Sequence, residues 1–315
     1  MSANPVEMTI FAIIGFTVAL INVPAIVVIF TSKAIKKYKE LVLIGGLCAV
    51  DVFCALFNSI ASIDRLISFP NGTDTLVPQM ACFFTYYVVV FFYAQLLVGI
   101  MILLVSCERF IVVFLPLFYT SVTRRKLIFT MIACLLLCFL LHLAVYFYII
   151  ATSPPNTLIN AFCYSAFVYP PIVANLLMTI RLAATGLGIA LYLPITIRIF
   201  QLKVAISNAQ KKAVFISTSN SATPQGGSQQ PLNSVTQNNS NIRFSVTIGL
   251  TCLSDLVLLF IPDIIINFDL FQLRAHHLIF SRASLLKTVI NLFIYTFRHN
   301  ELRKEVMMRL CSYHL

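Results

Sequence analysis

Long uninterrupted apolar stretches dominate this chain and leave few folds open to it. We expect seven membrane spans, at about residues 8–31, 41–62, 82–113, 127–150, 172–200, 244–268 and 276–297. Each is long enough to cross a bilayer, since a spanning helix needs about 20 mainly apolar residues. Backbone amides find no water in the hydrocarbon, so the spans must be helices or strands of a closed barrel. The runs do not alternate in polarity as barrel strands do, which predicts an all-α seven-transmembrane helix bundle.

The charge content agrees with a chain that lies mostly in lipid. Only 10% of the 315 residues are charged, and the mean hydropathy is +0.92, whereas a soluble protein carries roughly 25% charged residues. The net charge of +11 would suggest a nucleic-acid partner in a soluble protein. Here most Lys and Arg lie in alternate loops, which predicts that those loops are cytosolic. We therefore expect lipid, and no nucleic acid, as the surroundings of this protein.

The position of the positive residues also predicts an orientation. Lys33, Lys36, Lys37 and Lys39 follow the first span, and no positive cluster precedes it. This pattern predicts an extracellular N-terminus, no separate signal peptide and a cytosolic C-terminus. The expected location is the plasma membrane, with several passes through it.

Two loops have features of their own. The third cytosolic loop is expected at 203–242, and its stretch 217–241 is so rich in Ser, Asn, Gln and Gly that we expect disorder there. Its hydroxyl side chains are candidate phosphorylation sites that could recruit a kinase or an arrestin, although a plain flexible linker explains the composition equally well. Asn71 begins a glycosylation sequon in the first outer loop.

Common motifs of catalysis and metal binding are missing from the sequence. It contains no HExxH, GxSxG or Walker loop and no zinc-spaced Cys/His set. We therefore expect no enzymatic activity, no cofactor and no metal. His142 stands alone in the fourth span, where an interhelical hydrogen-bond donor is the simplest interpretation. Among nine cysteines, only Cys82 and Cys163 fall on the oxidising outer face.

Charged residues inside the spans are expensive and tend to face the interior of a bundle. Asp51, Asp255 and Lys287 lie too deep to reach the membrane surface, so each should have a partner. Arg181 and Asp263 fall on the outer halves of the fifth and sixth spans.

Two segments carry a resemblance to a known family. Glu108–Tyr119, at the inner end of the third span, resembles the (D/E)R(Y/F)…PLxY stretch of rhodopsin-like G-protein-coupled receptors. Asn291–Arg298 resembles the NPxxY motif that precedes the eighth helix of these receptors. The relaxed form of both motifs is most similar to the nematode serpentine chemoreceptors, and to the Srsx type among them.

The resemblance implies a receptor domain over residues 1–312 that transmits the binding of an unknown extracellular ligand to a heterotrimeric G protein. It implies a Cys82–Cys163 disulfide, a kink at Phe260 and Pro262, and an amphipathic eighth helix ending near Cys311. Cys311 is a candidate for palmitoylation, with a free thiol as the equal alternative. Coupling and activation would involve Glu108, Arg109, Phe110, Pro116, Leu117, Tyr119, Tyr192, Asn291 and Tyr295.

We expect a polar network in the core, formed by Asn22, Asp51 and Asn291, which match positions of the family, and by the deep charges Asp255 and Lys287. Such receptors often hold a sodium ion beside the acid of the second span. Lys287 lies four residues before Asn291, on the same helix face. Its ammonium could replace the sodium beside Asp51, or it could pair with Asp255; the sequence leaves both open.

Candidates for the ligand pocket are Arg181, Asp263, Tyr87 and Phe91. Arg181 could meet a carboxylate and Asp263 an amine, or the two could pair with each other. The aromatic residues of the third span are more often packing than ligand contacts.

The chain departs from the family pattern at several positions, and a second class of membrane protein also stays open. Leu292 replaces the proline of NPxxY, the chain has no Trp, and no acidic residue precedes Arg243 at the inner end of the sixth span. A transporter or channel also places charges in the membrane. It typically shows Gly or Pro interruptions paired between two halves, which we do not find, so the receptor is favoured.

Overall fold

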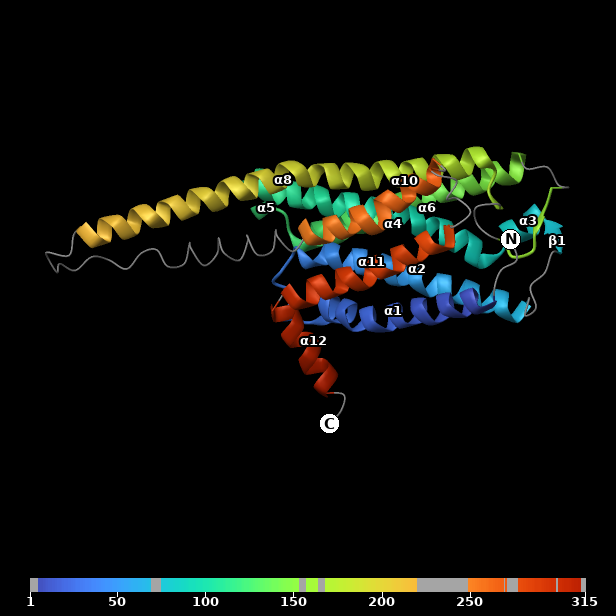
Figure 1. Cartoon of the computed structure of the whole chain (residues 1–315), viewed down its shortest axis with the longest axis horizontal. Coiled ribbons are helices and arrows are strands. Elements are labelled where there is room, and N and C mark those ends of the chain that lie inside the picture. The colour runs from blue at the N-terminus through green and yellow to red at the C-terminus, as the bar shows by residue number, and fades with distance from the viewer. Residues whose placement is uncertain are drawn as a thin grey trace.

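The computed structural model describes residues 5–68, 75–152, 157–163, 168–219, 249–268, 270, 277–298 and 300–312. Long helices run side by side along one axis, and this confirms the all-α bundle (Figure 1). The helices that form it are α1 (Pro5–Thr31), α2 (Leu41–Ser68), α4 (Tyr86–Phe114), α6 (Arg124–Thr152), α8 (Pro171–Ser219), α10 (Ile261–Asn267) with the π-helix η1 (Leu256–Phe260) before it, and α11 (His277–Arg298). A further helix, α12 (Asn300–Ser312), packs across one end.

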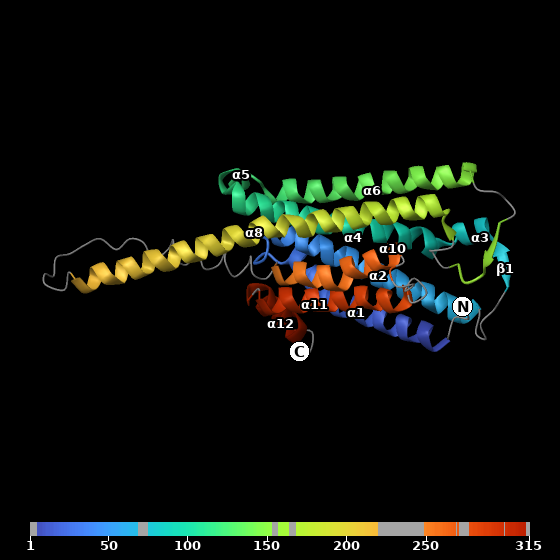
Figure 2. The same cartoon turned by 45° about the horizontal axis from the view of Figure 1, so that its top comes forward.

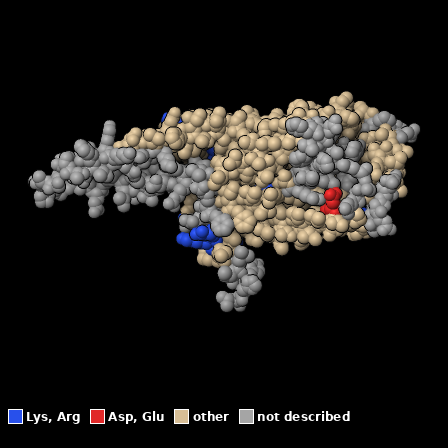
Figure 3. Space-filling model, viewed as in Figure 1, with Lys and Arg blue, Asp and Glu red and all other residues tan. Residues whose placement is uncertain are grey.

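The flanks of the bundle are suited to lipid. Within the described residues, six helices are long and apolar enough to cross a membrane, and α11 contributes a shorter apolar stretch, Ala283–Ile294. The helix α6 carries Leu137, Leu140 and Phe147 exposed to the outside, an arrangement that water would penalise. The visible flank in Figure 3 is almost free of charge, while Lys and Arg gather beside α12.

Several predicted boundaries differ from the structure; α2, for example, ends at Ser68 and not at residue 62. The third span does not begin at Cys82 as one helix, because the short helix α3 (Gln79–Phe83) is separated from α4 at Phe84 and Thr85. The fifth span continues far beyond residue 200, so that α8 extends past the rest of the bundle in both views (Figures 1 and 2). Residues 203–219, expected to open the third loop, therefore continue this helix; residues 220–241 and Asn71 lie outside the described residues.

One end of the bundle, here called the disulfide end, is closed by two loops that meet. Strand β1 (Leu76–Pro78) pairs antiparallel with β2 (Leu158–Asn160). The disulfide between Cys82 and Cys163 is present as predicted. Arg65, at the end of α2, donates from Nε to the carbonyl oxygen of Phe162 at 2.8 Å. Covalent and polar links thus fix the loops of this end over the helices.

The opposite end, here called the Arg109 end, includes α5 (Pro116–Thr120) and α12. Pro116 starts α5 at a position where a helix needs no N–H donor, while α4 ends at Phe114. Leu302 and Val306 of α12 are buried in a cluster with residues of α1 and α2, including Ile29. The predicted amphipathic eighth helix thus buries part of its apolar face against the bundle itself.

The sixth span departs from a regular α-helix for a local reason. Pro262 has no backbone N–H to donate to the preceding turn of the helix, and the π-helix η1 lies directly before it. A π-turn within an α-helix is rare and often marks a functional position. Asp255 immediately precedes η1, and Asp263 follows Pro262 in the first turn of α10, so the irregular turn lies between the two carboxylates.

Candidate functional site

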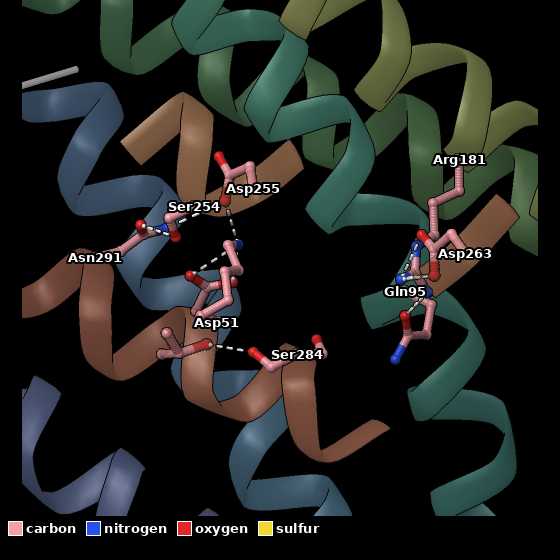
Figure 4. A network of polar contacts seen from close by, with 10 residues as sticks. Asp51, Gln95, Arg181, Ser254, Asp255, Asp263, Ser284 and Asn291 are labelled. Atoms are coloured by element: carbon pink, nitrogen blue, oxygen red, sulfur yellow. Dashed lines mark hydrogen bonds and ion pairs between the residues drawn. The ribbon is translucent and has the colours of Figure 1, made fainter. Parts of the chain in front are cut away.

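A buried ionic network joins α2, α11 and the sixth span in the middle of the bundle (Figure 4). The ammonium of Lys287 lies 3.1 Å from Oδ1 and 3.3 Å from Oδ2 of Asp51, and 3.5 Å from Oδ1 of Asp255. Asn291 donates from Nδ2 to Oδ1 of Asp255 at 3.3 Å and accepts from Ser254 Oγ at 3.0 Å. Lys287 is only 1% exposed, so these contacts are its means of remaining charged in the interior.

Both alternatives that the sequence left open are realised together. Lys287 bridges Asp51 and Asp255, and it makes the shorter contacts with Asp51. A sodium ion beside Asp51 does not fit these residues, because the ammonium already lies at hydrogen-bonding distance from both of its oxygens. The network carries two carboxylates and one ammonium; the hydrogen bond from Asn291 supplements the weaker ion pair of Asp255.

Two further predicted residues are Asn22, expected in this core network, and Tyr295, expected in coupling and activation. Asn22 is buried but donates to the carbonyl of Val18 in its own helix at 2.7 Å. Its Oδ1 has no hydrogen-bond partner among the described residues, so Asn22 is not joined to the network. The side chain of Tyr295 lies outside what the structure describes.

At the Arg109 end, three predicted residues form one connected group. Nη2 of Arg109 lies 3.0 Å from Oε2 of Glu108, and Tyr119 donates its hydroxyl to Oε1 of the same carboxylate at 2.6 Å. Glu108 and Arg109 are buried. Burial, and then the negative charge of Glu108, raise the pKa of the Tyr119 phenol above its ordinary value, so it stays a donor. The glutamate is therefore held from both sides.

The sequence did not identify the residues that hold this group from the neighbouring loop. Lys39 donates from Nζ to the carbonyl oxygens of Tyr119 at 2.5 Å and Val122 at 2.8 Å. Its ammonium also lies 4.0 Å from the centre of the Tyr119 ring. The next residue, Glu40, accepts from Arg109 Nη2 through its carbonyl oxygen at 3.2 Å. In the sequence, the basic run 33–39 stands out only as a charge pattern, which does not reveal contacts with carbonyl groups.

Other predicted coupling residues fall into two environments. Tyr192 of α8 is buried in a cluster that includes Ile195, with Phe110 packed against it. Its hydroxyl has no hydrogen-bond partner among the described residues. Leu117, in contrast, is 87% exposed on α5, next to the exposed ring of Phe118. Tyr192 and Phe110 belong to the packing between α4 and α8, whereas Leu117 and Phe118 are exposed and available to a partner protein.

The predicted kink residues make a tight contact with α8. A side chain on Gly186 would meet the ring of Phe260 at 2.8 Å, so the glycine provides the room for that ring. Phe260 is the last residue of η1 and lies two residues before Pro262. Gly186 could not have been singled out from the sequence, because the contact depends on how two helices pack.

A second ionic group lies nearer the disulfide end (Figure 4). Nη2 of Arg181 lies 2.8 Å from both carboxylate oxygens of Asp263, and Nη1 donates to Oε1 of Gln95. Of the alternatives left open by the sequence, the two predicted pocket charges pair with each other. The aromatic candidates are elsewhere: Tyr87 is buried at the disulfide end beneath Arg65, and Phe91 packs edge-on against Phe92.

A membrane-crossing helix bundle with a disulfide at one end and a buried Glu-Arg pair at the other defines a seven-transmembrane receptor. The family described as the serpentine type 7TM GPCR chemoreceptor Srsx matches residues 12–223, and the chain belongs to this family. The match extends from α1 past the end of α8 and so includes Asp51, Glu108, Arg109 and the disulfide. No curated protein matches the sequence. The predicted membership in the Srsx type is confirmed.

Proposed function

We propose that this receptor detects an extracellular chemical ligand at the disulfide end and activates a heterotrimeric G protein at the Arg109 end. The observation that carries the proposal is the group of Glu108, Arg109 and Tyr119. A buried arginine neutralised by one carboxylate can be exposed if that carboxylate is released. The exposed Leu117 on the neighbouring α5 would add an apolar contact for the same partner.

The orientation that this function needs has the disulfide end outside the cell. A disulfide persists in an oxidising compartment, which favours the extracellular side for Cys82 and Cys163. The positive residues of the 33–39 loop and of α12 lie at the opposite end and favour the cytosol there. We place the receptor in the plasma membrane on these grounds, with α8 extending into the cytosol.

Signalling would then be a shift between two conformations of the bundle. A ligand that binds one conformation better increases its population, and a G protein that prefers the same conformation is coupled to the ligand reciprocally. The π-helix η1 and Pro262 form the element most suited to change, because the backbone hydrogen bonding there is already irregular. The ionic network around Lys287 lies between the two ends and would adjust with it.

The direct test is Arg109→Ala, assayed for G-protein activation in cells with surface expression measured in parallel. We expect normal surface expression and loss of signalling. Arg125→Ala is the matched control, since Arg125 is an exposed arginine at the same end, and it should signal normally. Full signalling by Arg109→Ala would refute the assigned role.

Further partners are proposed for the parts that lie outside the described residues or side chains. A kinase would phosphorylate the 217–241 stretch, which would then recruit an arrestin, and Cys311 would carry a lipid. The transporter alternative is separated by the same assay: ligand-dependent G-protein activation supports the receptor, whereas ligand uptake without it supports transport.

A further inference from the structure

The buried group formed by Arg181, Asp263 and Gln95 joins three helices in the half of the bundle nearer the disulfide end (Figure 4). Arg181 comes from α8, Asp263 from α10 and Gln95 from α4. Arg181 and Asp263 are both more than nine-tenths buried. An ion pair in such a place is costly to desolvate and calls for an explanation beyond stability.

Hydrogen-bonding capacity remains unused around Arg181. Its Nε has no hydrogen-bond partner among the described residues, and neither has the hydroxyl of Thr185, which lies one turn further along α8 and is fully buried. Buried donors are normally paired, and a guanidinium offers five N–H groups to acceptors. The group therefore has donors to spare, and a ligand rich in acceptors is the complement it lacks.

The two partners of the ion pair differ in how firmly the backbone holds them. A side chain on Gly99 of α4 would lie 2.9 Å from the carbonyl oxygen of Arg181 and 3.3 Å from its Cγ. The backbones of α4 and α8 are thus in direct contact at Arg181, which fixes the arginine. Asp263 instead follows Pro262 and the π-helix, on the element best suited to move.

We propose that Arg181 is the recognition site for an organic carboxylate, which replaces the carboxylate of Asp263 and so releases α10 from α8. This inference rests on the proposed receptor function and names its ligand class. The exchange leaves the guanidinium paired with a carboxylate, and Nη2 together with the unused Nε–H would give the incoming carboxylate a two-pronged geometry. The Thr185 hydroxyl provides a further donor for the incoming oxygens. The displaced Asp263 leaves the dry interior as α10 moves.

An amine ligand is disfavoured by the same geometry. An ammonium that took Asp263 would leave Arg181 charged and unpaired in the interior, where Gly99 and Gln95 hold it in place. Removing one partner of a buried pair is strongly unfavourable. A carboxylate ligand avoids this cost, because it pairs with the fixed Arg181 while Asp263 moves away with α10.

The test uses the full-length receptor and a panel of monocarboxylates, each with the primary amide and the amine of the same carbon skeleton. Two measurements are made: the melting temperature of the purified receptor, which reports binding without a G protein, and G-protein activation in cells. Wild type should be stabilised and activated by carboxylates, but not by their amides or amines. Arg181→Gln should lose both responses, and Arg181→Lys should weaken them, since lysine keeps the charge without the fork.

Asp263→Asn should raise signalling in the absence of ligand and lower the half-maximal carboxylate concentration. We expect a shift of about 5–150-fold, the usual range of allosteric coupling. The uncharged double variant Arg181→Gln/Asp263→Asn guards against misfolding, since it leaves no buried charge; it should signal without ligand and ignore carboxylates.

The outcomes separate this inference from the proposed function. Activation of wild type by the amines, or unchanged carboxylate responses in Arg181→Gln, would overturn the inference. So would a receptor with Arg109-dependent basal signalling that responds to no carboxylate of the panel. Carboxylate binding that depends on Arg181 but never activates a G protein would support the site and contradict the proposed function.

Discussion

The ammonium of Lys287 lies 3.1 Å from Oδ1 of Asp51, and both side chains are buried. The same ammonium also reaches Asp255 at 3.5 Å. One lysine on α11 therefore supplies the positive charge that lies beside carboxylates on both α2 and the sixth span. Because the ammonium is part of the lysine side chain, it cannot dissociate from the core as a free ion would. The three helices are therefore joined by a covalently tethered charge.

Lys287→Met should destabilise the receptor strongly. Methionine has a similar length but leaves Asp51 and Asp255 without a cation in the interior, at a cost of about 3–5 kcal/mol. The melting temperature of the purified protein measures the loss. Lys36→Met, which removes an exposed lysine, is the control and should leave it unchanged. Adding Asp51→Asn to Lys287→Met should recover part of the loss; no recovery would argue against the pairing.

Lys287→Ala should create a response to sodium that the wild type lacks. Alanine removes the ammonium and opens room beside two carboxylates, which a small cation can then occupy. The melting temperature is compared in sodium chloride and in choline chloride at equal ionic strength. The variant should be more stable in sodium, and the wild type should show no difference. Equal sodium dependence in both proteins would contradict the tethered cation.

Lys39→Met should raise signalling in the absence of ligand. The variant removes both hydrogen bonds that Lys39 donates to the segment after α4 and its contact with the Tyr119 ring. Tyr119 is then less firmly placed to hold Glu108, and Arg109 is released more easily. Basal G-protein activation, normalised to surface expression, is the measurement. Lys37→Met, at an exposed neighbour, should leave basal activity unchanged.

Tyr119→Phe should lower the stability of the receptor, and this loss should become smaller at alkaline pH. The hydrogen bond to a carboxylate contributes about 1.5–3 kcal/mol. Because the folded protein raises the pKa of Tyr119, this stabilisation is complete below the unfolded pKa of about 10 and is lost as the pH rises through the folded value. The difference in melting temperature between wild type and variant should be constant from neutral pH to about pH 10, then shrink. A difference already shrinking between neutral pH and pH 8 would contradict this account.

The elements that hydropathy and short motifs determine could be predicted from the sequence. The apolar runs predicted the bundle, and the family motifs predicted the disulfide and the ion pair between Glu108 and Arg109. The helix break at Phe84 and Thr85 was missed because the apolar run is continuous there. The extension of α8 past residue 203 was missed because polar composition suggested a loop, although polar residues in water also form helices.

Contacts set by packing between helices could not be predicted. The sequence cannot decide whether Lys287 contacts Asp51 or Asp255, because this depends on the rotation of two other helices. In the structure, Lys287 contacts both carboxylates. Lys39 donates hydrogen bonds to the carbonyl oxygens of Tyr119 and Val122. These acceptors are backbone atoms, which every residue carries, so the contact leaves no signal in the sequence. Glycines such as Gly186 show their role only when the partner ring is in place.

Gly99→Ala should disrupt the contact between α4 and α8 that fixes Arg181. Its Cβ would lie 2.9 Å from a backbone oxygen, which cannot rotate away as a side chain can, so the helices must separate. Overpacking of this kind costs about 1–3 kcal/mol and should appear as a lower melting temperature. Gly188→Ala is the matched control on the same interface, because its nearest contacts are side-chain atoms of Ile102 and Ser106 at 3.2 Å. A smaller loss for Gly188→Ala would identify the close backbone approach, rather than the added methyl group, as what positions Arg181; equal losses would contradict it.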